Sequence, residues 1–375
     1  MPLDALCLSG IVHELNTALA GSKIDKIYQP GRDEILLALR TQGGNAKLLL
    51  SANPSHPRPQ LTQLPRENPD TPPMFCMLLR KHLTSGRILE VTQPPLERVV
   101  EFRLEALDEL GDRVERRLML EVISHRANLV LLDGEGRILD CIRRVDSGLS
   151  DGTGSGRLLQ PGMFYRLPPA QSKEDPLHAD RQRLEELLST APDEAQADKW
   201  LLDTFGGLSP LVCRELAQQA GGSTDIRLNV LGPAGRTRLL DQLEWLIRSV
   251  KENHFHPTLI YLDGKAKDFT FLPVTQYGGA AKLESWPTFS AMLDQFYEQK
   301  ESLERIKQKY PNLPMMLCSG GGGRCDYEAL KYFTEFWPSD NTDAVERIFI
   351  QWGYSHFFPA KSMAAHVTSW GKQPV

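Results

Sequence analysis

Three segments decide the fold of this chain: VVEFRLEAL (Val99–Leu107), RRLMLEVI (Arg116–Ile123) and NLVLLD (Asn128–Asp133). In each segment apolar residues either alternate with polar ones or form a short continuous run, which are the patterns of half-buried and fully buried strands. Short polar spacers separate the segments, and the third runs into a turn at Asp133–Gly136. Closely spaced strands joined by turns pair with their neighbours. The three segments therefore predict an antiparallel meander.

The residues before the meander add more strands and two helices. Apolar residues recur at helical spacing in Ile11–Ala20 and in MFCMLLRKHL (Met74–Leu83), which follows two prolines and ends in a basic turn. Short strand patterns fill the space between the helices. They are Lys26–Tyr28, Glu34–Leu39 and Lys47–Ser51. Several strands with a few helices predict an α+β domain over residues 1–170.

Residues 171–250 have the apolar spacing of packed helices. At their centre, FGGLSPLVCREL (Phe205–Leu216) joins two helical segments through a Gly-Gly pair, with Ser209 as a helix cap. This pattern predicts a helix-hairpin-helix, whose backbone N–H groups can hold a phosphate. Gly206, Gly207 and Ser209 are the candidate phosphate contacts. Plain packing of two helices is the alternative.

The last third of the chain changes character twice. Strand patterns return at Pro257–Leu262 and Asp268–Pro273, within a segment that spans residues 251–287. A heptad-like apolar stripe follows over residues 288–310 and predicts the start of a coiled-coil helix. Two prolines then end that helix. Residues 311–375, which include a run of glycines, receive no domain assignment.

Composition limits the class of protein. The 375 residues carry a formal net charge of −5, with 41% hydrophobic and 24% charged residues. This predicts a globular protein of two or three domains and excludes a polycationic coat, while a local basic face for nucleic acid stays open. The apolar runs fall far short of the roughly 20 residues that span a bilayer, and no basic leader begins the chain. We therefore expect a cytoplasmic protein with no membrane partner.

No motif for catalysis or metal binding is evident. The nine histidines and six cysteines form no HExxH and no paired-cysteine zinc pattern, and the glycine run before Arg324 lacks the GK[ST] ending of a phosphate loop. The scattered cysteines are typical of buried, reduced thiols. Pro2 is a candidate amine nucleophile, but Leu3 follows it in place of an acid. We expect no cofactor, no metal site and no enzymatic activity.

Ten blocks in order along the chain resemble the NFACT family, also described as fibronectin-binding protein A. The most specific part is MFCMLLRKHL, within the block PPMFCMLLRKHLTSGRI, and the resemblance covers about residues 1–309. The other blocks are MPLDALCLSGIVHELN, IDKIYQPGRDEILLALR, KLLLSANPSHPRPQLT, QPPLERVVEF, EVISHRANLVLLD, PGMFYRLPP, FGGLSPLVCREL, HPTLIYLDGKAKDFTFLPV and WPTFSAMLDQFYEQKESLERIKQK. Family members continue through a long coiled coil to a second RNA-binding domain, whereas Tyr310–Val375 resembles neither.

The resemblance implies a two-part NFACT-N domain with a glycosylase-like α/β fold, its parts at residues 1–170 and 251–287, with the helix-hairpin-helix domain inserted between them. It also implies a ribosome quality-control factor. Such a factor holds a tRNA, expected to be an alanine tRNA, on a large ribosomal subunit that carries stalled peptidyl-tRNA. It supports untemplated alanine addition to the nascent chain, with the peptidyl-transfer chemistry left to the ribosome.

The resemblance also carries residues over for RNA contact. The family's Asp-Arg dipeptide falls on Glu97-Arg98, an acid longer by one methylene beside a guanidinium that suits phosphate or base edges. A charge at a strand edge is the alternative role of Arg98. Arg80 and Lys81 match the family and are candidate phosphate contacts, with helix capping as their alternative.

A second family block, resembling E-M-G-R-H-S-N, matches this chain at Glu121 and Asn128. Between them a cation remains at Arg126, but shifted in position. We expect Glu121, Arg126 and Asn128 to belong to the RNA-binding surface.

Two other functions remain open. The family's older name suggests a surface adhesin for fibronectin, against which the missing signal peptide argues. The family's fold also resembles formamidopyrimidine-DNA glycosylases, against which Leu3 and the missing four-cysteine zinc finger argue.

Overall fold

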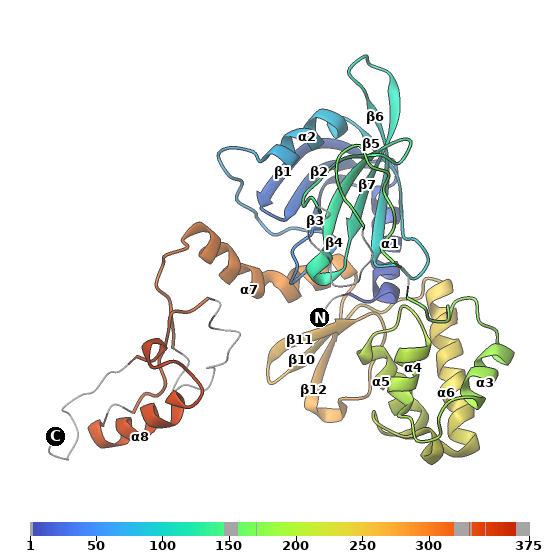
Figure 1. Cartoon of the computed structure of the whole chain (residues 1–375), viewed down its shortest axis with the longest axis vertical. Coiled ribbons are helices and arrows are strands. Elements are labelled where there is room, and N and C mark those ends of the chain that lie inside the picture. Colours follow the sequence, from blue (N-terminus) through green and yellow to red (C-terminus); the bar gives the residue numbers. More distant parts are fainter. Residues whose placement is uncertain are drawn as a thin grey trace. The chain divides into compact units, whose positions relative to one another are not determined.

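The structure is a computed structural model that describes residues 3–145, 157–169, 171–318, 330, 332–341 and 343–364 (Figure 1). The flexible loop expected at Ser147–Gly156, the glycine run Gly320–Gly323 and Pro2 lie outside the described residues. The chain divides into two compact units, Met1–Phe296 and Tyr297–Val375.

A nine-stranded antiparallel sheet dominates the first unit. Its strand order is β4-β3-β2-β1-β5-β6-β7-β8-β9. The strands are β1 (Lys23–Gly31), β2 (Glu34–Thr41), β3 (Gly44–Ser51), β4 (Arg58–Leu61), β5 (Arg87–Thr92), β6 (Val99–Leu107), β7 (Arg113–Glu121), β8 (Asn128–Asp133) and β9 (Ile138–Cys141). The predicted meander is confirmed as β6, β7 and β8, in a register that pairs Glu121 with both Val99 and Asn128.

Three strands of this sheet, β4, β5 and β9, were not predicted from the sequence. β4 lies in the proline-rich stretch before α2, and β5 lies between α2 and the meander. Pro59 opposes Leu50 inside β4, which is tolerated because β4 is an edge strand of the sheet. The prolines of this stretch argue against a strand in the sequence, but an edge strand can accommodate a residue that has no N–H to donate.

Two helices pack on the sheet. Helix α1 (Ala5–Leu19) contacts β4 and β5, and α2 (Met74–Leu83) contacts β1 and β6. The bounds of α2 are as predicted, whereas α1 begins earlier than expected because Asp4 caps it by accepting a hydrogen bond from Cys7 N at 2.6 Å. Leu3, just before this cap, is buried.

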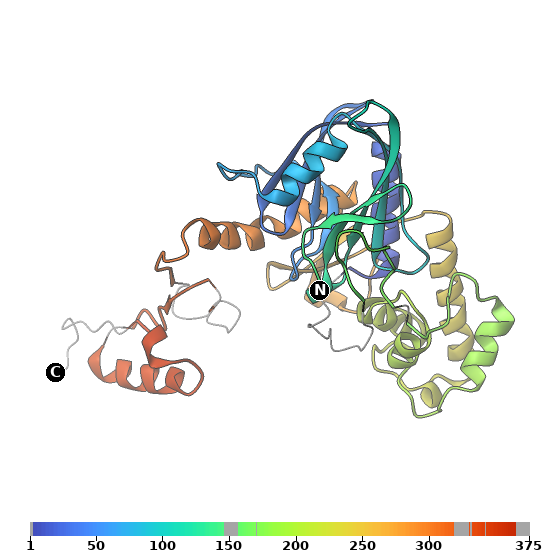
Figure 2. The ribbon, with the colours of Figure 1, turned by 45° about the horizontal axis from the view of Figure 1, so that its top comes forward.

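Four helices occupy the predicted helical region. They are α3 (Arg181–Ser189), α4 (Ala197–Thr204), α5 (Pro210–Gly221) and α6 (Leu228–Lys251). Figures 1 and 2 both show them gathered beside one another and away from the large sheet. Gly206 and Gly207 lie in the turn between α4 and α5, and a kink at Gly232, just before Pro233, interrupts α6 after its first turn. The helix-hairpin-helix assignment of this region stays a prediction.

The chain then returns to β structure. β10 (Thr258–Leu262), β11 (Lys265–Thr270) and β12 (Ala281–Ser285) form a sheet with β10 in the centre. β12 was not predicted, and it follows a short 3-10 turn, η2 (Gly278–Ala280). Helix α7 (Phe289–Lys309) starts where the sequence placed it. Its role as the start of a coiled coil stays a prediction. No helix among the described residues has the length and apolar character to cross a membrane.

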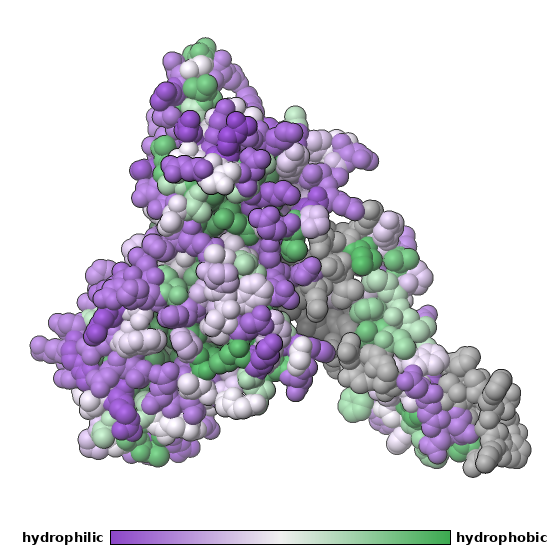
Figure 3. Space-filling model, turned by 180° about the vertical axis from the view of Figure 1, so that it is seen from behind, coloured by the Kyte–Doolittle hydropathy of each residue, from purple (hydrophilic) through white to green (hydrophobic). Residues whose placement is uncertain are grey.

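The second unit contains structure in a segment that received no assignment from its sequence. Its described elements are α8 (Ala344–Ser355), a parallel pair of short strands, β13 (Met316–Leu317) and β14 (Glu335–Phe336), and the 3-10 turn η4 (Ala360–Ser362). Buried Arg347 donates from α8 to the backbone oxygens of Ser339 and Ala364. Hydrophobic side chains are also exposed on α8, and Figure 3 shows hydrophobic residues at the surface of this unit.

Candidate nucleic-acid interface

On the face of the first unit seen in Figure 3, hydrophilic residues predominate over scattered hydrophobic ones. Five of the sequence-predicted residues lie at or next to the ends of β6, β7 and β8 nearest the start of α1: Glu97, Arg98, Glu121, Arg126 and Asn128. Burial lowers the pKa of Arg98, and the nearby Arg126 cation lowers it further. The carboxylates of Asp4 and Glu97 act in the opposite direction. Arg98 and Arg126, predicted from separate blocks, therefore lie within electrostatic range of one another. An anion between two cations relieves their repulsion.

Asp4 connects this cationic pair to the helical region. Its carboxylate caps α1, receives a hydrogen bond from the Ser209 side chain and interacts with Arg98. Burial raises the pKa of Asp4, and these hydrogen bonds oppose part of that rise. The Ser209 hydroxyl oxygen in turn caps α5 by accepting from Val212 N at 3.4 Å. The Ser209 side chain, a predicted phosphate contact, is therefore hydrogen-bonded to both Asp4 and Val212.

The Gly-Gly turn is packed against the loop that carries Arg98. Gly206 is buried and its N–H donates to the oxygen of Glu174 at 2.9 Å, so this N–H has a protein partner, and the phosphate contact at Gly206 stays a prediction. Gly207 has a φ of +80°, and a Cβ placed there would lie 2.9 Å from Cδ2 of Leu96. The glycines allow a left-handed turn and a close approach. Plain packing, the alternative for this motif, describes the turn.

Glu121 and Asn128 are supports and not surface groups. Glu121 is 1% exposed, and its two oxygens accept from Nη1 and Nη2 of Arg157 at 3.0 and 2.5 Å and from the Tyr165 hydroxyl at 2.9 Å. Asn128 is 2% exposed and donates to the oxygen of Arg143 at 2.7 Å. Buried polar groups that are fully bonded hold neighbours in place. Protein groups already occupy both side chains, which gives them a supporting role here, and their direct contact with RNA stays a prediction.

A pocket of about 210 Å³ opens beside these supports. Its polar lining includes exposed Arg126 and His125 together with Arg143 and Arg157. The apolar lining residues are Ile123, Val145, Leu159, Pro168 and Pro169. Arg143 and Arg157 were not predicted from the sequence. The feature of the sequence that could have drawn attention to them is their position, because the two arginines lie on either side of the Ser/Gly-rich segment 147–156.

Arg80 and Lys81 lie apart from this pocket, on α2. The Arg80 side chain donates from Nε to the oxygen of Ile27 at 2.9 Å, which anchors α2 to β1. Lys81 Nζ is 2.6 Å from Oε1 of Glu109 in the β6–β7 turn, and both side chains are largely exposed. Exposed pairs of this kind are weak and screened by salt. Lys81 can exchange Glu109 for a phosphate, whereas Arg80 already donates the hydrogen bond to Ile27 that anchors α2.

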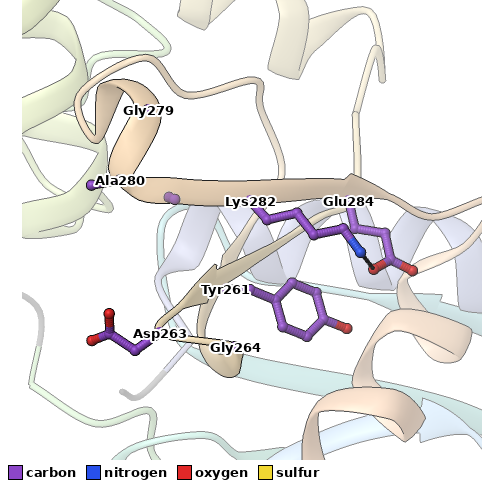
Figure 4. A pocket seen from close by; sticks show the side chains of 8 residues that line it. Tyr261, Asp263, Gly264, Gly279, Ala280, Lys282 and Glu284 are labelled. Atoms are coloured by element: carbon purple, nitrogen blue, oxygen red, sulfur yellow. Dashed lines mark ion pairs between the residues drawn. The ribbon is translucent and has the colours of Figure 1, made fainter.

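A second hollow, of about 500 Å³, lies on the three-stranded sheet (Figure 4). Figure 4 shows Lys282 reaching Glu284, with the Tyr261 ring below them and Asp263 turned away. Lys282 Nζ is 3.6 Å from Oε2 of Glu284 and 5.5 Å from the centre of the Tyr261 ring. These polar groups pair with one another, and no sequence-predicted residue lines the hollow. Among the described residues, no group of three or more His, Cys, Asp or Glu could hold a metal ion.

The fold and the cationic pair define a mixed α+β protein built on a large antiparallel sheet, with a basic site at the ends of its strands. The family model for the NFACT N-terminal and middle domains matches residues 4–317, and the chain belongs to the NFACT family. A Bacillus subtilis relative named "Rqc2 homolog RqcH" is 36% identical over 314 residues, which cover 84% of this chain and 52% of the relative. A relative of the same name from Streptococcus suis is 30% identical over 310 residues, covering 82% and 50%. The chain thus spans about half the length of these curated relatives.

Solved structures agree with the family assignment. The N-terminal part of the fibronectin/fibrinogen-binding protein of Streptococcus suis has a TM-score of 0.64 and 28% identity, covering 79% of this chain and 99% of that one. The fibrinogen-binding protein of Staphylococcus aureus has a TM-score of 0.65 and 27% identity, covering 79% and 98%. These neighbours confirm the α+β fold expected from the sequence.

The end of the chain is similar to a different family. The Melibiase model matches residues 284–374, which overlap the NFACT match as far as residue 317. An Escherichia coli α-galactosidase is 44% identical over 77 residues, covering 20% of this chain and 10% of that enzyme. The segment that had no domain assignment from its sequence therefore resembles a short part of α-galactosidases.

Proposed function

We propose that this chain is a ribosome quality-control factor that binds tRNA and the large ribosomal subunit with stalled peptidyl-tRNA. In this role it supports untemplated alanine addition in the cytoplasm. The observation that carries the proposal is the meeting of Arg98 and Arg126, two cations from separate sequence blocks whose like charges act on one another. Keeping like charges close costs free energy, which a bound phosphodiester recovers.

The surroundings of Arg98 support a binding role. The carboxylates of Asp4 and Glu97 act on the guanidinium of half-buried Arg98 and favour its charged form, which is the form that binds a phosphate. The names of the Bacillus subtilis and Streptococcus suis relatives support the quality-control role. We propose further that the chain contributes binding and positioning and that the peptidyl-transfer chemistry belongs to the ribosome. On this account the residues at the site need no nucleophile and no general base.

The experiment compares Arg98→Ala with Arg113→Ala in cells that produce tagged protein. Arg113 is a matched control because it lies at the opposite end of β7 and its side chain is exposed, paired only weakly with Glu105 at 3.4 Å. Co-purified tRNA and co-sedimentation with large ribosomal subunits are measured. Arg98→Ala should reduce both, and Arg113→Ala should retain both. Unchanged tRNA and subunit binding by a folded Arg98→Ala protein would reject the proposal.

A fibronectin-binding adhesin is the second candidate, because the solved relatives are named for fibronectin or fibrinogen binding. This function requires the protein at the cell surface. Antibody labelling of intact cells, followed by binding of purified protein to immobilised fibronectin, distinguishes the two functions. Absence of surface labelling rejects the adhesin, and it leaves the tRNA measurements to decide the first proposal.

A further inference from the structure

Helix α8 carries its apolar residues on the side that faces solvent. These residues recur at the i, i+3, i+4, i+7 spacing of one helix face: Val345, Ile348, Phe349 and Trp352. They are called here the α8 stripe, and their side chains are 44%, 66%, 65% and 67% exposed. The opposite side of the helix carries Arg347, which is 1% exposed. Because an amphipathic helix normally turns its apolar face towards the core, the orientation of α8 is reversed.

The side chain of Arg347 fixes this orientation. Its Nη1 donates to the oxygens of Ser339 and Asn341 at 2.7 and 3.3 Å, and its Nη2 donates to the oxygen of Ala364 at 2.9 Å. The guanidinium also lies 5.2 Å from the centre of the Trp337 ring. Rolling α8 inwards would break these hydrogen bonds, which is costly for a buried cation. The α8 stripe is therefore covered only if something docks on the outer side of the helix.

The α8 stripe has no charge of its own. The charged residues of α8 are Glu346 and Arg347, and Arg347 is buried. Helices that lie on lipid surfaces carry exposed Lys and Arg beside their apolar face, and surfaces for nucleic acid also need exposed cations. An uncharged stripe with aromatic residues is instead typical of the centre of a protein–protein interface.

The size of the stripe matches a small interface between two copies of this chain. An aromatic side chain has roughly 150–250 Å² to bury, so each exposed ring contributes about 100–150 Å² at its exposed fraction. The rings are those of Phe349, Trp352 and the adjoining Phe357, which is 65% exposed. With Ile348 and Val345 the apolar area is about 500 Å² per chain, and two chains would bury about 1,000 Å², near the lower limit of a specific interface.

The order of residues along the stripe fits a second copy in the antiparallel direction. Val345 and Trp352 are equally far in sequence from the midpoint between Ile348 and Phe349. About a two-fold axis at that midpoint, the small side chain of Val345 faces the partner's Trp352, and the same contact is made twice. Gly353 borders the stripe, and a Cβ there would meet no described atom within 4 Å, so the second helix has room to approach closely.

We propose that two copies of this chain associate through the α8 stripe, as an antiparallel pair of helices about a two-fold axis. The small contact area makes this a weak dimer, with a dissociation constant of about micromolar size. The pair does not depend on the proposed RNA-binding function, because no residue of that site takes part in it.

Sedimentation velocity of the full chain, from about 1 to 200 µM, measures the association. The mass of the wild type should approach that of two chains. Phe349→Glu places like charges beside the two-fold axis, and it should raise the dissociation constant about thirtyfold or more. Trp352→Gln removes an aromatic anchor without adding charge, and it should raise the constant about tenfold. Far-ultraviolet circular dichroism checks that each variant is folded.

The matched control is Leu110→Glu, in the β6–β7 turn of the first unit. It puts the same charge on an apolar side chain that is 87% exposed and lies outside the stripe. This variant should associate as the wild type does. Equal loss of the dimer in Leu110→Glu and Phe349→Glu would mean non-specific association and would overturn the proposal.

Disulfide trapping tests the antiparallel direction, in a chain whose Cys318 and Cys325 are replaced by serine. Ile348→Cys lies beside the two-fold axis, so it should link to the same position of the second copy on mild oxidation. Val345→Cys lies about 10 Å along the helix from its counterpart, which is too far for a disulfide, and it should not link. Equal linkage by the two variants means a parallel pair and rejects the arrangement proposed.

The mass of the wild type decides the remaining outcomes. A wild type that stays monomeric at the highest concentration overturns the pair and leaves the stripe to a different partner. Particles that grow past two copies without a plateau also overturn it, because a two-fold pair is closed. Changes in tRNA binding by Arg98→Ala bear on the proposed function alone.

Discussion

Glu14 caps helix α7, with its Oε2 atom 2.6 Å from the backbone nitrogen of Phe289. Its second oxygen accepts from the nitrogen of Ser290 at 3.1 Å. A carboxylate at a helix start satisfies N–H groups that have no partner within the helix and complements the helix dipole. Gly10, one turn earlier on α1, permits this approach, since a Cβ there would lie 2.7 Å from the Phe289 ring. One residue near the start of the chain thus fixes the start of α7.

We expect Glu14→Ala to lower the free energy of unfolding by about 1–2 kcal/mol, because two backbone donors lose their acceptor. His13→Ala is the control, since this neighbouring side chain on α1 is exposed. Urea denaturation of both variants measures the difference. Equal midpoints for Glu14→Ala and His13→Ala would mean that the cap contributes nothing.

A second prediction concerns the turn that packs on the Arg98 loop. Gly207 and Gly222 have nearly the same positive φ, +80° and +78°, but an added Cβ would meet neighbours within 4 Å only at Gly207, the nearest being Leu96. Gly222→Ala should cost about 1 kcal/mol from backbone strain alone. Gly207→Ala should cost clearly more, and adding Leu96→Ala should recover part of the excess. Equal losses for the two single variants in thermal unfolding would refute the close packing.

The buried ion pair between Glu121 and Arg157 gives a third prediction. Glu121→Gln removes the charge that compensates a mostly buried guanidinium, and breaking such a pair costs about 3 kcal/mol. Glu105→Gln breaks the exposed pair with Arg113 and should cost less than about 1 kcal/mol. Chemical denaturation compares them. A Glu121→Gln protein as stable as Glu105→Gln would show that Glu121 is not the support described above.

The fourth prediction is a pH dependence at α2. Burial lowers the pKa of His82, and the charges of Arg116 and Lys81 lower it further, while Glu109 opposes them. The unfolded chain therefore binds a proton at His82 near pH 6.5, where the folded chain does not. Stability should fall as the pH decreases from about 7 to 5, and His82→Gln should reduce that slope. Parallel stability curves for the two proteins would contradict this assignment.

Local periodicity of apolar residues predicted those helices and strands whose pattern lies entirely within the element itself. The alternation in Val99–Leu107 and the helical spacing in Met74–Leu83 do not depend on distant residues, and both elements have the predicted type. β4 and β12 were missed, because the first contains a proline and the second is short and mostly exposed. β4 is a strand because it pairs with β3, and β12 is a strand because it pairs with β10.

The site was predictable only in part, for a different physical reason. The proximity of Arg98 and Arg126 follows from the resemblance together with the meander that places their strand ends together. Whether Glu121 faces solvent depends on Arg157, and whether Asn128 does depends on Arg143. Neither Arg157 nor Arg143 lies on the strand that carries the buried polar residue to which it is hydrogen-bonded. Burial of a polar side chain is a property of the three-dimensional contacts, which sequence spacing does not contain.

The most direct test of the central claim, that Arg98 and Arg126 hold an RNA backbone, is the salt dependence of tRNA binding. The logarithm of the association constant is measured against the logarithm of salt concentration for the wild type, Arg98→Ala and Arg126→Ala. Each substitution should weaken binding and reduce the slope by about one, because each removes one phosphate contact and its counterion release. A slope and an affinity that neither substitution changes would contradict the claim.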